Sequence, residues 1–112
     1  TIKLNNNKQY NLTVKVYNIA SGVIKEVSST ILAQATSHEF YFIPSGVSVT
    51  VQKTDKDKSG YPIGLLSSWQ TAASGTGSIL FKLMHKTALK GPNDGPNVGH
   101  SDIQLNLPII IK

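Results

Sequence analysis

The sequence of 112 residues contains no cysteine and no arginine, and each absence excludes a class of function. Without cysteine the chain has no disulfide, no thiolate nucleophile and no thiolate ligand for zinc or an iron–sulfur cluster. Without arginine it lacks the side chain that holds phosphates with two hydrogen bonds and reads guanine edges. Eleven lysines against six acidic residues give a net charge of +5, yet we expect no nucleic-acid partner.

Long apolar runs are also absent, so the sequence predicts neither a transmembrane span nor a hydrophobic signal segment. The chain begins with Thr1 rather than methionine, and we therefore expect a processed or trimmed protein. Its length fits one domain over residues 1–112 with a single core. Because this leaves little room for a cleft between two lobes, size favours a binding or structural module over an enzyme.

Apolar and polar residues alternate along most of the chain, which is the pattern of half-buried β-strands. In GVSVTVQKT, for example, Val47, Val49 and Val51 share one face and have the branched side chains that favour strands. The same period runs through the segments QYNLTVKVYN, SHEFYFIP, SILFKLMH and DIQLNLPIII. With about seven or eight short strands and no alternation with helices, the sequence predicts an all-β, antiparallel β-sandwich of the immunoglobulin-like class.

Proline, glycine and serine indicate where these strands end. Pro44 ends one run, and the Pro-Ser-Gly at 44–46 predicts a short hairpin into the next strand. Pro108 interrupts the last alternating run and indicates an edge or a bulge. The segment NIASGVIKEVSSTIL predicts two short strands about a Ser-rich centre, and one or two helical turns are expected near Leu65–Trp69.

The stretch KTDKDKSGYP raises the question of a metal site, because Asp55, Asp57 and Ser59 have the spacing of the first half of a calcium loop. The twelfth position of such a loop supplies a bidentate carboxylate, but here that position is Leu66. The positive charges of three neighbouring lysines would also repel a bound cation. We predict a polar hairpin tip, keep a weak calcium site as the alternative, and expect no cofactor.

No catalytic constellation stands out in the sequence. The three histidines, His38, His85 and His100, are too far apart in the chain to be assigned to one metal centre. Neither a phosphate-binding loop nor a nucleophile motif is present. We therefore predict a protein without catalytic residues.

Three segments together resemble the soluble domain of the type VI secretion outer-membrane lipoproteins: LTVKVYNIAS, EFYFIPSGVSVTVQ and SDIQLNLPIII. In that family an early V-x-V-x-Y strand precedes a loop, and a later strand enters a tight Pro-Gly turn. Val14, Val16 and Tyr17 match the first feature approximately, and residues 44–51 match the second with Ser45 inserted. The late Trp-Arg pair of many members and the lipidated cysteine are missing, so the resemblance is to a divergent, intracellular-pathogen-like member.

The resemblance implies a transthyretin-like sandwich, anchored at the periplasmic face of the bacterial outer membrane by an N-terminal lipid upstream of Thr1. Its partner would be the periplasmic part of an inner-membrane channel component, and its role would be that of a bracket in a machine associated with virulence. The partner-binding loop of the family follows its first strand. In this chain it corresponds to Ile19, Ala20, Ser21, Gly22 and Val23.

A second candidate surface follows from length and composition alone: the connector Gly91–Ser101, rich in proline, glycine and asparagine. Its polar side chains include Asn93, Asp94 and Asn97. The alternative function is that of a small carbohydrate-binding or adhesin-type sandwich, with a site made by this connector together with Tyr61 and Trp69. We interpret Trp69 first as a core anchor, because a lone tryptophan in a small domain more often fills the core.

Overall fold

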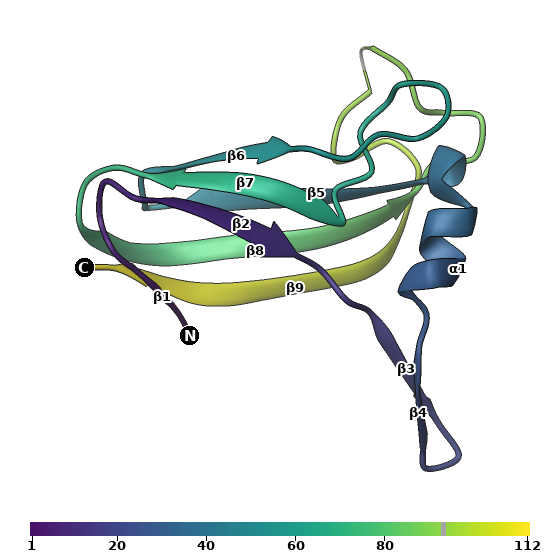
Figure 1. Ribbon diagram of the computed structural model, residues 1–112, viewed down its shortest axis with the longest axis horizontal. Coiled ribbons are helices and arrows are strands. Elements are labelled where there is room, and N and C mark those ends of the chain that lie inside the picture. Colours follow the sequence, from purple (N-terminus) through teal and green to yellow (C-terminus); the bar gives the residue numbers. More distant parts are fainter. Residues whose placement is uncertain (93) are drawn as a thin grey trace.

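The computed structural model describes residues 1–92 and 94–112, and most of them lie in β-strands (Figure 1). The largest sheet has four strands, in the order β1 (Ile2–Leu4), β9 (His100–Ile111), β8 (Gly75–His85) and β5 (His38–Ser45). All neighbours in this sheet are antiparallel except β1, which runs parallel to the last residues of β9. The all-β prediction is confirmed.

A second, antiparallel sheet has the order β2 (Gln9–Thr13), β7 (Leu66–Thr71) and β6 (Val49–Lys53). The strands β3 (Tyr17–Ala20) and β4 (Val23–Glu26) pair only with each other and form a separate hairpin. A short helix, α1 (Ser28–Ala33), and a 3-10 turn, η1 (Ala35–Ser37), lead from the hairpin into β5. Within the described residues, no helix has the length and apolar character needed to cross a membrane.

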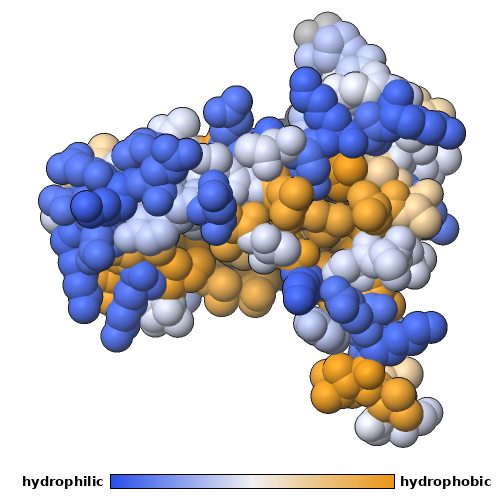
Figure 2. All heavy atoms as spheres, viewed as in Figure 1, coloured by the Kyte–Doolittle hydropathy of each residue, from blue (hydrophilic) through white to orange (hydrophobic). Residues whose placement is uncertain are grey.

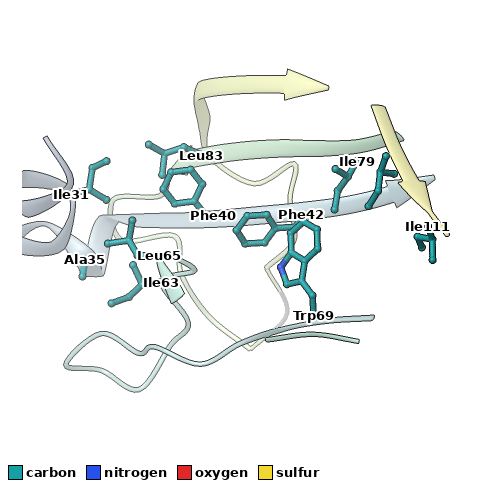
Figure 3. Close-up of a cluster of buried hydrophobic side chains, with 11 residues drawn as sticks. Ile31, Ala35, Phe40, Phe42, Ile63, Leu65, Trp69, Ile79, Leu83 and Ile111 are labelled. Carbon is teal, nitrogen blue, oxygen red and sulfur yellow. The ribbon is translucent and has the colours of Figure 1, made fainter. Parts of the chain in front are cut away.

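The core lies where the two larger sheets face each other (Figure 3). Trp69 on β7 packs edge-on against Phe42 on β5 and Phe81 on β8, with ring centroids 5.7 Å and 6.1 Å away. Each such aromatic pair contributes about 0.5–1.5 kcal/mol beyond its buried area. Trp69 is 2% exposed and its indole N–H donates to Ser67 Oγ. The core-anchor interpretation is confirmed, and a sugar platform at Trp69 is excluded because the ring does not reach solvent.

The hairpin predicted at Pro44–Gly46 is wrong. β5 pairs with β8 whereas β6 pairs with β7, so the chain crosses from one sheet to the other at this point. Phe42 on β5 is buried in the core, and Val49 and Val51 on β6 pack against that core. Alternation fixes which residues of a strand face the core, but not whether the next strand joins the same sheet.

The helical turn expected near Leu65–Trp69 is also wrong, because this segment forms the central strand β7, paired on both sides. Helix occurs instead at Ser28–Ala33, within the segment whose pattern predicts two strands. The serine- and threonine-rich segment has weak helix propensity, so tertiary contacts stabilise the helix. Ile31 is buried in the core, and Ser28 Oγ accepts a hydrogen bond from the Val16 amide at 2.7 Å.

Candidate functional site

The structure places Ile19–Val23, the candidate from the family resemblance, at the tip of the β3–β4 hairpin, which projects away from both sheets (Figure 1). Ser21 and Gly22 make the turn, with φ angles of 52° and 76°. Positive φ at both central residues is typical of the type I′ turn, whose twist matches that of the paired strands. Two short strands therefore lie in this segment as predicted, but they flank Ser21 and Gly22, whereas the serine-rich part at Ser28 begins α1.

Large apolar side chains cover the hairpin and face solvent (Figure 2). The exposed fractions are 71% for Ile19, 67% for Ile24, 64% for Val23 and 53% for Tyr17. Ile19 and Ile24 lie directly opposite each other across the two strands. Since alternate strand residues share a face, Tyr17 belongs to the same apolar face as this pair. Exposed apolar clusters of this kind mark interaction surfaces more often than scattered single residues do.

The base of the hairpin is tied to the rest of the fold. The Val27 amide donates to the Val16 carbonyl at 2.8 Å and so joins the two segments that enter and leave the hairpin. Beside this base lies an open apolar groove of about 380 Å³, lined on one side by Val14 and Val16 and on the other by Phe81 and Leu105. Tyr17 lines the groove and begins β3, so the groove and the hairpin form one continuous apolar surface.

The connector Gly91–Ser101 differs from the hairpin, because its described polar side chains bond within the chain. The Asp94 carboxylate pairs with Lys86 at 2.8 Å, and Asn97 Oδ1 accepts from Lys82 Nζ at 2.9 Å. Asn93 lies outside the described residues. Asp94 and Asn97 therefore hold the connector in place, and these contacts explain their positions without a binding partner.

A buried ion network underlies this connector, and sequence reasoning missed it because lysines usually lie on the surface. Lys86 is fully buried, and its ammonium group bonds to the Asp94 carboxylate, the Gly95 carbonyl and the Tyr41 hydroxyl. Glu39 lies 3.8 Å from Lys86 and pairs with Lys53 at 2.6 Å. Burial, together with the negative charges of Glu39 and Asp94, raises the pKa of Tyr41, so this hydroxyl stays protonated.

Lys90 forms a second buried ion pair. Its ammonium group lies 2.8 Å from Asp57 Oδ2 and also donates to three backbone carbonyls, those of Ala35, His38 and Pro62. Burial raises the pKa of the Asp57 carboxyl, but hydrogen bonds from Lys90 and from two backbone amides, with the Lys90 charge, outweigh it and hold the pKa below its ordinary value. Lys90 thus joins the connector to the loop between β6 and β7 and to the start of β5.

The calcium candidates lie in that same loop, whose flanking strands β6 and β7 are paired as a hairpin. Asp55 accepts backbone hydrogen bonds at both carboxylate oxygens, from the amides of Gly64, Leu65 and Leu66. Asp57 Oδ1 accepts from the amides of Ser59 and Tyr61. The carboxylates therefore bond within the polar tip as turn residues do, and weak calcium binding at Asp55, Asp57 and Ser59 stays the untested alternative.

Two of the three histidines come together in the fold. His38 and His85 are cross-strand partners on β5 and β8, with stacked rings 4.6 Å apart, and Asp102 lies beside both. His100 pairs with His85 in the strand register but lies outside this group. Spacing along the chain gave no signal for the group, because strand pairing alone brings its members together.

Comparisons with protein-family models, with curated proteins and with solved structures gave no match. The resemblance to the secretion lipoproteins therefore stays a prediction. The functional hypothesis is built on the surfaces described above.

Proposed function

We propose that this chain is a non-enzymatic β-sandwich domain that binds a protein partner through the β3–β4 hairpin. The facing sheets with one shared core support the sandwich assignment, in the transthyretin- or immunoglobulin-like class. The observation that carries the binding hypothesis is the projecting pair Ile19 and Ile24, each about two-thirds exposed. Burial of apolar surface stabilises a complex by about 25 cal/mol per Å², and the chain itself leaves this surface unburied.

The hairpin is suited to insertion into a partner. Its two-residue turn and the Ile19–Ile24 pair make a narrow wedge with apolar side chains on both faces, because Val23 and Ala20 lie on the face opposite Tyr17. The groove at its base extends the apolar surface towards the core. A partner that receives the wedge would bury these side chains at the centre of the interface, where binding energy concentrates.

Following the family resemblance, we propose that the domain is an outer-membrane lipoprotein component of a bacterial secretion machine. It would be anchored at the periplasmic face and would dock the periplasmic part of an inner-membrane component. The place of the hairpin supports this proposal, because its turn directly follows Val14, Val16 and Tyr17, the residues that match the early strand of that family. In this chain, however, β2 ends at Thr13 and residues 14–16 form a link to β3 rather than a strand.

The docking hypothesis is tested with the double variant Ile19→Ser and Ile24→Ser, assayed against the purified periplasmic domain of the inner-membrane component by calorimetry. We expect the affinity to fall at least about tenfold, since hot-spot residues contribute about 2 kcal/mol or more. The matched control is Ile43→Ser, which changes an exposed isoleucine of β5 outside the hairpin and should leave affinity unchanged. Equal binding by the double variant and the control would overturn the role of the hairpin.

The anchoring hypothesis has its own test, the intact mass of the native protein recovered from membranes. We expect a diacylated or triacylated cysteine upstream of Thr1, because stable anchoring requires more than one acyl chain. An unlipidated protein would overturn the anchor. It would leave the hairpin as a protein-binding surface to be tested by the variants above.

A further inference from the structure

One end of the four-stranded sheet brings together two imidazoles and a carboxylate that the proposed function does not use. His38 is the first residue of β5, His85 is the last residue of β8, and Asp102 lies near the start of β9. Antiparallel pairing places these three strand ends at the same end of the sheet, next to α1 (Figure 1). The cluster therefore consists of groups from three neighbouring strands.

A β-bulge positions the carboxylate. Leu83 pairs with Ile103 and Met84 pairs with Ser101, so Asp102 is an extra residue in β9 without a partner of its own. Bulges re-aim side chains, and this one brings Asp102 Oδ2 to 3.5 Å from His38 Nε2 and 3.8 Å from His85 Nδ1. One nitrogen of each ring and one carboxylate oxygen lie within 4.8 Å of one another.

The remaining ring nitrogens are already occupied by protein groups. His38 Nδ1 lies 3.0 Å from the Gln34 carbonyl oxygen, which only accepts, so this nitrogen carries a proton. His85 Nε2 lies 2.8 Å from Thr87 Oγ1. Metal-binding histidines typically have such a partner at the second nitrogen, and for His38 the Gln34 carbonyl holds the ring with Nε2 towards Asp102.

Gly99 holds the start of β9 close to this group. Its φ of 96° is unfavourable for other residues, and a Cβ built there would lie 2.3 Å from the His85 carbonyl oxygen. Only glycine allows the backbone of β9 to approach His85 so closely. This close approach brings the following residues, including Asp102, near the histidine pair.

We propose that His38, His85 and Asp102 bind one divalent transition-metal ion of the zinc type. Bonds of about 2.0–2.1 Å in tetrahedral geometry separate ligand atoms by about 3.3–3.4 Å, close to the spacings from Asp102. Two imidazoles and one carboxylate favour zinc and its neighbours over calcium or magnesium, which prefer oxygen ligands. His85 must turn its ring towards the ion, and its side chain is 42% exposed, so space is available.

The charges around the site permit a cation there. Lys90 donates to the His38 carbonyl, and Asp57 neutralises this ammonium group at 2.8 Å. Lys86, which follows His85 in the chain, is paired with Asp94 at 2.8 Å. Three protein ligands leave a fourth tetrahedral position for water or for a group from another molecule. This inference depends on the sheet geometry alone and is independent of the hairpin and of the proposed anchor.

The test is a calorimetric titration of the full chain, freed of metal with a chelator, with Zn²⁺ at neutral pH. We expect one ion per chain and a rise in the melting temperature on saturation, because the ion binds only the folded site. His85→Ala and Asp102→Asn change partly or largely exposed ligands and should each lower zinc affinity at least about tenfold. His38 is buried and is left unchanged so that the variants fold.

The matched control is His100→Ala, which removes an exposed histidine from the strand position opposite His85. This variant should bind zinc as the wild type does. Absence of stoichiometric binding by the wild type would overturn the proposal, since contacts among the two histidines and Asp102 without a metal would then explain the geometry. Equal affinity in His85→Ala, or an equal loss in His100→Ala, would overturn it by placing the ion elsewhere.

Discussion

The β3–β4 hairpin and the connector after β8 both violate the usual distribution of side chains, in opposite ways. The hairpin exposes Ile19 and Ile24, whereas the connector region, taken as residues 86–92 and 94–101, buries the charged groups of Lys86 and Lys90. Each buried ammonium group has a carboxylate partner and further oxygen acceptors within the chain. The exposed isoleucines make one cross-strand pair and otherwise face solvent.

The difference separates groups that stabilise the fold from groups available for binding. A buried charge without a partner costs several kcal/mol, so Lys86 requires the bonds it makes. Exposed apolar surface lowers the stability of the fold only slightly, and its burial by a partner stabilises the complex. This contrast supports the proposal that the connector region stabilises the fold and the hairpin binds a partner, and the following variants test that division.

The largest effect is expected for Lys86→Met, which keeps most of the side-chain volume and removes the charge. The variant leaves Asp94 without its cation, and we expect the free energy of unfolding to fall by about 3–5 kcal/mol. Chemical denaturation followed by the fluorescence of Trp69 measures this change. Lys82→Met is the matched control, since the bonds of Lys82 within the described residues go to Asn97 and the Pro96 carbonyl, and it should cost under about 1 kcal/mol. Similar losses in both variants would contradict a special role for the buried pair.

An intermediate effect is expected for Asp57→Asn, which keeps the size of the side chain but removes the charge facing Lys90. Loss of this charged hydrogen bond should lower the free energy of unfolding by about 1.5–3 kcal/mol at neutral pH. Because the pKa of Asp57 is lowered in the folded state, its stabilisation is present above the ordinary aspartate pKa and is lost as pH falls through the folded value.

The stability difference between wild type and Asp57→Asn should therefore shrink as pH falls below about 3.9. Urea denaturation at a series of pH values measures it. Glu26→Gln, at an exposed acid on the hairpin, is the control and should change stability by less than about 0.5 kcal/mol at neutral pH. A difference that stays constant down to acid pH would show that the charge of Asp57 is not what stabilises the loop.

The smallest effect on stability is expected for the double variant Ile19→Ser and Ile24→Ser. Both side chains are outside the core, so the free energy of global unfolding should change by less than about 1 kcal/mol. Amide hydrogen exchange should accelerate only within residues 17–26, because an isolated two-stranded hairpin is marginally stable. Ile79→Ala, in the fully buried core, should instead cost about 2–5 kcal/mol. A large global loss in the double variant would show that the hairpin belongs to the folding core.

Local pattern predicted much of the secondary structure and little of the arrangement. The alternation in SHEFYFIP and SILFKLMH corresponds to β5 and β8, and Ser21-Gly22 lies at the centre of the predicted strand pair. The sheet to which each strand belongs could not be predicted, because both sheets direct the same apolar period at one core. The helix at Ser28–Ala33 has no pattern of its own and depends on its packing.

The candidate sites follow the same division. Ile19–Val23 was selected from the family resemblance; the structure places it at a hairpin tip, and its binding role stays a prediction. The group of His38, His85 and Asp102 was not predicted, because its members are far apart along the chain and an extra residue in β9 aims the carboxylate. Lys86 and Lys90 were missed because composition gives a lysine no sign of burial. A register prediction pairing His38 with His85 is the one signal that would have drawn attention to the cluster.

The parallel pairing of β1 with the last residues of β9 places both termini in one half of the four-stranded sheet and the histidine cluster at the other end. Ile2 pairs with Ile109 and Leu4 with Ile111, and the Lys112 amide donates to the Leu4 carbonyl at 2.8 Å, so the first and last strands lie side by side in one half of the sheet. His100, at the other end of β9, is about 36 Å away by the rise of an extended strand. A probe attached after Lys112 would therefore lie at the end of the sheet opposite the histidine cluster.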